Sequence, residues 1–176
     1  MKHIRFKKMV RLYVLAASLI GSTICVDEAI TLSGHELIVN TSPSMPRGLY
    51  WIALGEQPTR RGEIVSFVPP ASVGALIYAR GWLAKGMPLL KPVGALAGDT
   101  YCVKDRRFVV NDVDAGPVFL LDGQGQPLPQ IAGCHRIDRD QFLPVSSHLD
   151  RSFDGRYMGA LSTHVVLGTG RALLTF

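Results

Sequence analysis

The stretch that decides the fold is Asn40-Thr41-Ser42-Pro43-Ser44-Met45-Pro46-Arg47-Gly48-Leu49-Tyr50-Trp51. It sets two serines among prolines and then enters an aromatic and β-branched run, bounded by Gly48 and Gly55. Proline and serine favour turns, whereas aromatic and β-branched residues favour strands. We therefore predict a turn that leads into a strand over 48–54. By itself this turn indicates no chemistry, because Ser-Pro-Ser segments are ordinary turn sequences.

Similar patterns continue through the rest of the chain. Short strand-like runs bounded by Gly, Pro or Asn-Asp occur at 35–40, 63–68, 100–103, 108–110, within 136–145 and before Phe176, and 114–135 resembles an irregular loop. One helix is expected from Ser72, as its cap, to Gly86. With 176 residues, 47% of them hydrophobic, and 18 Gly and 11 Pro, the sequence predicts a single, mainly β domain.

The N-terminus has the pattern of an export segment. Five basic residues and no acid lie in the first 11 positions, and residues 12–26 carry no charge. Fifteen helical residues span about 22 Å, short of a hydrocarbon core of about 30 Å. We predict that 1–28 is a signal peptide or signal-anchor helix and that 29–176 is a periplasmic domain. Whether residues 1–26 are cleaved stays open.

Charge and cysteine content narrow the choice of partners. The net charge of +5 comes from the N-terminal segment, since the other 14 basic residues balance the 14 acidic ones. This distribution argues against nucleic-acid binding. Cys102 and Cys134 would lie in an oxidising compartment, so either a disulfide or two buried thiols is possible. No cysteine or histidine spacing fits a metal site, and no cofactor is expected.

Lys91 lies in the apolar run Leu89-Leu90-Lys91-Pro92-Val93. The ordinary pKa of lysine, about 10.4, keeps the amine protonated at neutral pH. Desolvation disfavours the ammonium and lowers that pKa, so a buried lysine can serve as a general base for a serine. The alternative is a surface lysine whose stem covers apolar neighbours.

Four segments, in this order, favour the first alternative: Ser42-Pro43-Ser44-Met45; Arg61-Gly62-Glu63-Ile64-Val65-Ser66-Phe67; Leu90-Lys91-Pro92-Val93 with Gly98-Asp99; and Ser152-Phe153-Asp154-Gly155-Arg156-Tyr157-Met158-Gly159. They resemble the conserved boxes of the type I signal peptidase family of serine/lysine proteases. The resemblance spans residues 40–168 and implies a signal-peptidase-like β-sheet or barrel fold, with one short helix before the base lysine. The continuation Pro46-Arg47-Gly48-Leu49-Tyr50 resembles the conjugal-transfer, or TraF, branch of that family.

The resemblance also implies roles for single residues. Ser44 would be the nucleophile and Lys91 its base, with the Ser44 N–H and the Ser42 hydroxyl as oxyanion donors. Ser152 would hydrogen-bond the lysine amine, and Arg156 would support Asp154. Asp154 is a third candidate for catalysis, with a bracing role as the alternative.

One departure bears on Asp154. Pro92 replaces the arginine that often follows the family's lysine and pairs with the late aspartate. Asp154 is thus left with Arg156 as its neighbour in sequence.

The function implied is a serine endopeptidase at the outer face of the inner membrane. It would process, and in one outcome cyclise, a pilin precursor for a conjugative type IV secretion system. Its partners would be the pilin precursor, the inner membrane and other proteins of the conjugation apparatus. The alternatives are a general signal peptidase and a non-catalytic pilus-assembly protein of the same fold.

Overall fold

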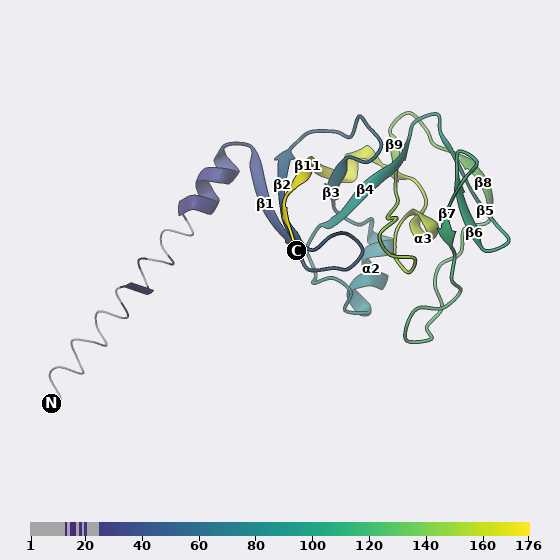
Figure 1. Cartoon of the computed structure of the whole chain (residues 1–176), viewed down its shortest axis with the longest axis horizontal. Helices are drawn as coiled ribbons and strands as arrows, with labels where there is room; N and C mark the ends of the chain where they lie inside the picture. Colours follow the sequence, from purple (N-terminus) through teal and green to yellow (C-terminus); the bar gives the residue numbers. More distant parts are fainter. Residues whose placement is uncertain (1–12, 14, 17, 19, 21–24) are drawn as a thin grey trace, which may run out of the picture.

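The computed structural model describes residues 13, 15, 16, 18, 20 and 25–176. The expected signal or anchor segment, 1–28, lies largely outside these residues. Within the described part, no helix combines the length and the apolar character needed to cross a membrane. Residues 25–32 are helical and lead into the first strand of the folded body (Figure 1).

Seven strands form the larger sheet, and each neighbouring pair in it is antiparallel. Their spatial order is β1 (His35–Asn40), β2 (Gly48–Leu54), β11 (Val166–Thr175), β3 (Ile64–Phe67), β4 (Leu89–Leu96), β9 (Gln141–Pro144) and β10 (Leu161–Ser162). The prediction of a mainly β fold is confirmed. The barrel alternative is wrong. Among the described residues, β1 and β10 are the two edge strands of this sheet and do not pair with each other, so the sheet stays open.

A second sheet of four strands packs beside the first (Figure 1). Its order is β7 (Val113–Pro117), β6 (Arg107–Val110), β5 (Thr100–Lys104) and β8 (Gly133–Arg136). Tight turns with positive φ at Asp105, Arg106, Asn111 and Asp112 join β5, β6 and β7. Cys102 lies directly opposite Cys134, and a disulfide joins them. Both ends of the predicted loop 114–135 are therefore strands.

Two short α-helices lie within the folded body, besides the helical residues 25–32 that precede it. The expected helix before the base lysine is α2 (Ala71–Ala79), but it starts after Pro70 without a side-chain cap, so Ser72 is not the cap. It ends near Gly81, whose φ is 66°, and not at Gly86. The second helix, α3 (Gly155–Met158), was not expected; the Asp154 side chain caps it by accepting a hydrogen bond from the Arg156 N–H. A 3-10 turn, Thr163–Val165, precedes β11.

The hydrophobic core places the serine loop next to the lysine strand. Met45 is buried with Tyr50, Ile52 and Leu90 in one cluster, and Leu90 precedes Lys91 on β4. A separate cluster joins the two sheets and α3 through Ala95, Tyr101, Phe108, Leu143 and Tyr157, among others. The methionine after the nucleophile candidate is therefore the apolar anchor that holds its loop against β4.

Close contact between β2 and β11 depends on glycine. A Cβ at Gly168 would lie 2.2 Å from the Ala53 carbonyl oxygen, and one at Gly170 would lie 2.0 Å from that of Trp51. Any side chain at either position would therefore separate the two strands. Because β2 directly follows the serine loop, the contact between β2 and β11 also fixes the C-terminal end of that loop.

Candidate active site

The side chain of Asn40 holds the serine loop, residues 41–47, from inside. Its Nδ2 donates to the carbonyl oxygens of Ser42 at 3.0 Å, Met45 at 3.3 Å and Pro46 at 3.0 Å. Its Oδ1 accepts from the Ser42 N–H at 3.1 Å. One buried amide therefore fixes most of the turn, a role that the sequence reasoning missed. Asparagine's preference for turns was the available signal.

Ser44, which is 8% exposed, sits at the centre of this loop. Its Oγ lies 2.9 Å from the Ser42 Oγ, and its N–H donates to that same oxygen at 3.3 Å. The two groups expected to bind an oxyanion are thus bonded to each other in this state. Among the hydrogen bonds of the described residues, none joins Ser44 Oγ directly to Lys91.

Lys91 lies on β4 and is 3% exposed. Its Nζ donates to the Ser152 Oγ at 3.0 Å. Burial lowers the pKa of Lys91 to about 8, the Asp154 carboxylate opposes that shift, and the Arg156 charge adds to it. Ser44, Lys91 and Ser152 all line one cavity of about 700 Å³. The structure therefore places these three predicted residues together.

Asp154 and Arg156 form a buried pair behind the lysine. Asp154 is 0% exposed, Arg156 is 1% exposed, and Arg156 Nε lies 3.3 Å from Asp154 Oδ1. That Nε makes no aligned hydrogen bond among the described residues. Burial raises the pKa of Asp154, while the Arg156 guanidinium and the Ser146 N–H hold it down in part.

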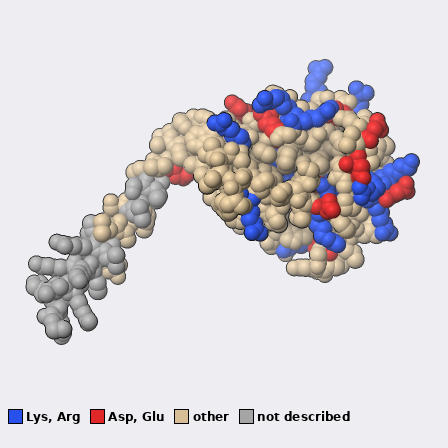
Figure 2. Space-filling view, viewed as in Figure 1, with Lys and Arg blue, Asp and Glu red and all other residues tan. Residues whose placement is uncertain are grey.

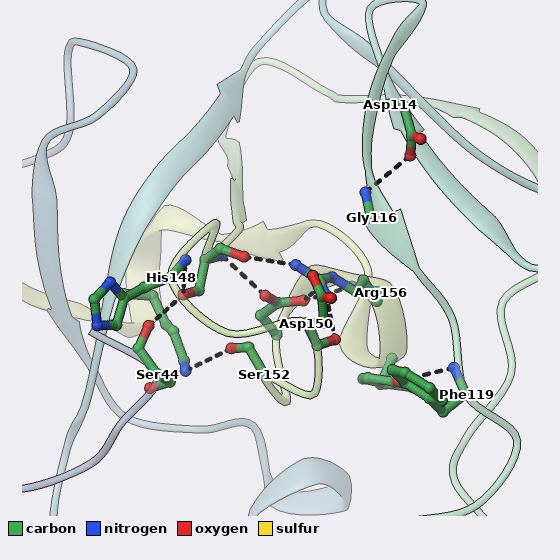
Figure 3. A network of polar contacts seen from close by, with 12 residues as sticks. Ser44, Asp114, Gly116, Phe119, His148, Asp150, Ser152 and Arg156 are labelled. Carbon is green, nitrogen blue, oxygen red and sulfur yellow. Dashed lines mark hydrogen bonds and ion pairs between the residues drawn. The ribbon is translucent and has the colours of Figure 1, made fainter. Parts of the chain in front are cut away.

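Ser146 joins this pair to the serine loop. Figure 3 shows the polar network that extends from Ser44 to Arg156. Its N–H donates to Asp154 Oδ2 at 2.9 Å, and its carbonyl oxygen accepts from Arg156 Nη2 at 2.5 Å. Its hydroxyl donates to the Ser44 carbonyl oxygen. No sequence pattern indicated Ser146, because these contacts depend on the end of β9 lying beside the serine loop.

Aromatic side chains form much of the cavity wall. Trp82 packs on Phe153, and Phe153 stacks on Tyr157 at 5.4 Å between ring centres. The loop after β7 contributes Phe119, Asp122 and Leu128 to the wall. Arg80 holds this loop, since it binds Asp122 at 3.0 Å and the Pro127 carbonyl oxygen at 2.6 Å. Much of the cavity wall is therefore apolar.

A serine and a buried lysine facing one cavity, on a mainly β fold, are the arrangement expected of the serine/lysine class of peptidases. The similarity of this chain to known proteins agrees with that class. The family described as "Signal peptidase, peptidase S26" matches residues 6–175.

Several curated proteins are also similar to this chain. The plasmid transfer protein TraF of Escherichia coli is 30% identical over 183 residues, 98% of this chain and 99% of that protein. The conjugal transfer protein TraF of Agrobacterium fabrum is 31% identical over 78% of this chain and 82% of that protein. A solved signal peptidase I of Enterococcus faecalis is similar only weakly, with 17% identity and a TM-score of 0.38 over 68% of this chain and 100% of that one. The chain belongs to the S26 signal peptidase family, in its TraF branch.

Proposed function

We propose that this protein is a serine endopeptidase of a conjugative transfer system and that it processes a pilin precursor. The observation that carries the proposal is the buried Lys91, whose amine is held by Ser152 in the cavity that Ser44 also lines. A structural lysine has no need of a pKa near 8, whereas a general base does. The family and the names of the TraF relatives support the link to conjugal transfer.

In the proposed mechanism, Ser44 Oγ turns from Ser42 toward the substrate and bonds to the scissile carbonyl carbon. Neutral Lys91 takes the serine proton as the bond forms. The lysine then gives that proton to the leaving amine as the peptide bond breaks, which leaves an acyl-enzyme on Ser44. Ser152 keeps the amine pointed at the cavity through both transfers.

The oxyanion would be bound by the two groups that bind each other in the free protein. The substrate's oxygen would replace the Ser42 Oγ as acceptor of the Ser44 N–H, and the freed Ser42 hydroxyl would donate to it. Losing one such donor costs about 3–4 kcal/mol in comparable sites. Water attacking the acyl-enzyme would give a linear product, and an amine of the pilin would give a cyclic one.

Exposed apolar residues beside the cavity support a membrane-associated position. Val39 is 63% exposed and Leu174 is 62% exposed, and both lie in register with Leu49 across β1, β2 and β11. Val39 also lines the cavity. We place this face at the outer surface of the inner membrane, where the precursor and other conjugation proteins would meet it.

The face of the molecule drawn in Figure 2 has no charge pattern suited to nucleic acid. On the face drawn in Figure 2, basic and acidic side chains are intermixed over the folded body. The pilin precursor is therefore the proposed partner.

The proposal is tested with purified protein in detergent and the cognate pilin precursor. Cleavage by the wild type, with none by Ser44→Ala, supports it. Equal cleavage of unrelated secretory precursors would instead indicate a general signal peptidase, and a folded but inactive wild type would indicate a non-catalytic assembly protein. A product lighter by one water than the linear form would identify cyclisation.

A further inference from the structure

We infer that Ser146 is a positioning residue that holds the serine loop, residues 41–47, in a fixed place relative to Lys91. This inference rests on the proposed peptidase function. Ser146 follows β9 and is fully buried. Each of its polar groups is bonded: the N–H to Asp154, the carbonyl oxygen to Arg156, and the hydroxyl to the Ser44 carbonyl oxygen. The His148 N–H also donates to that hydroxyl oxygen at 3.3 Å.

The direction of the bond to Ser44 follows from these partners. A carbonyl oxygen only accepts, and the Ser146 oxygen already accepts from His148. The Ser146 proton must therefore point at Ser44. This bond spans 102 residues, and it links the backbone of the nucleophile to the residue that holds Asp154.

Asn40 and Ser146 stabilise the serine loop in different ways. Asn40 bonds the carbonyl oxygens of Ser42, Met45 and Pro46, all within six positions, so it fixes the shape of the loop. Ser146 bonds the carbonyl oxygen of Ser44, which Asn40 leaves free, and it does so from the segment that follows β9, the strand paired with β4. A loop that kept its shape without Ser146 could still move as a unit away from the lysine.

Holding this carbonyl fixes the peptide plane between Ser44 and Met45. The Cα–Cβ bond of Ser44, about which its Oγ turns, then has a set position relative to Lys91. Because a misplacement of about 1 Å can cost roughly a hundredfold in rate, loss of this single bond should slow acylation. Substrate binding should change little, because the Ser146 side chain does not line the cavity.

The first arm of the test measures single-turnover cleavage of the pilin precursor at saturating enzyme. Ser146→Ala should lower the rate constant roughly 10- to 100-fold. In a companion series below saturation, the enzyme concentration that gives half of the maximal rate constant should be nearly unchanged. Ser147→Ala, at the exposed neighbouring position, should match the wild type. A rate constant within twofold of wild type in Ser146→Ala overturns the inference. The inference is also overturned if only a smaller fraction of the Ser146→Ala protein is active but that fraction cleaves at the wild-type rate. Such a result would indicate a purely structural role.

The second arm needs no peptide substrate, so it decides the inference even if the wild type proves inactive on pilin. Ser44→Cys is made in a Cys25→Ser background, because Cys25 is free and exposed. A thiol near the Lys91 ammonium has a lowered pKa and reacts faster at pH 7. Ser146→Ala should slow its alkylation by iodoacetamide several-fold, and an unchanged rate overturns the inference.

Both arms require folded protein, which melting curves establish. Ser146→Gly serves as a second truncation if Ser146→Ala aggregates. Failure of both variants to fold would also overturn the inference, since Ser146 would then be supporting the whole fold and not aiming the nucleophile.

Discussion

Lys91 Nζ donates a 3.0 Å hydrogen bond to Ser152 Oγ, although the two residues lie 61 positions apart. Both side chains are almost completely buried. A buried amine has few partners, so this one bond decides where the rest of the amine points. With one N–H on Ser152, the lone pair of the neutral lysine can face the cavity that holds Ser44.

Replacing Ser152 by alanine should therefore disturb orientation more than binding. We expect Ser152→Ala to lower kcat roughly 10- to 100-fold while KM changes little. The measurement is steady-state cleavage of the pilin precursor, with Ser72→Ala on the exposed side of α2 as the control. An unchanged kcat would show that the lysine needs no such partner.

The rate should rise with pH through the pKa of Lys91. Only the neutral amine can accept the Ser44 proton, and the neutral fraction grows as pH passes about 8. The pH profile of kcat/KM should thus have an ascending limb near 8. A limb near 6.5 would indicate a histidine base instead, and the chain has five histidines. Lys91→Ala should remove the limb together with the activity.

Asp154→Asn tests whether the aspartate is a brace or a catalytic group. The substitution would leave the Arg156 charge buried without its counter-charge, and breaking a buried pair in this way costs about 3–5 kcal/mol. We expect a large fall in the free energy of unfolding, measured by urea denaturation. Asp150→Asn is the matched control, because only the carbonyl oxygen of Asp150 binds Arg156. Unchanged stability with lost activity would instead make Asp154 catalytic.

The disulfide should stabilise the protein without affecting the chemistry. Cys102 and Cys134 are 32 residues apart, and closing a loop of this size is worth about 3–4 kcal/mol in the chain-entropy account. Replacing both by serine should lower the free energy of unfolding by up to that amount. Because the pair lies on the four-stranded sheet and does not line the cavity, kcat should stay unchanged where the variant is folded. Cys25→Ser should change neither quantity, and a doubly substituted protein as stable as the wild type would contradict the prediction.

Local patterns in the sequence predicted most of the strands. The run from Gly48 to Leu54 and the β5–β6 hairpin follow from residue type and turn chemistry alone. The helix end was placed too late, at Gly86, because Gly81 comes first in the chain and already adopts the positive φ that ends a helix. Barrel closure was wrong because edge pairing is decided by the packing of distant strands, which no local pattern contains.

The residues of the candidate site also differ in whether the sequence alone could predict them. Ser44, Lys91 and Ser152 could be proposed because they lie in segments that resemble family boxes. Ser146 could not be proposed, because it acts on a backbone carbonyl group, and for Asn40 the available signal was only asparagine's general preference for turns. Any residue with a suitable side chain can bond a carbonyl oxygen, so the role depends on position in the fold and leaves no pattern in the sequence.

The most direct test of the Ser44–Lys91 pair is the mass of the cognate pilin in cells. Cells would express that pilin with the wild-type protein, with Ser44→Ala or with Lys91→Ala, and mass spectrometry would measure the pilin. The account predicts the mature mass with the wild type and the uncut precursor mass with both variants. The mature mass in cells that carry either variant at wild-type abundance, and no other copy of the protein, would contradict it.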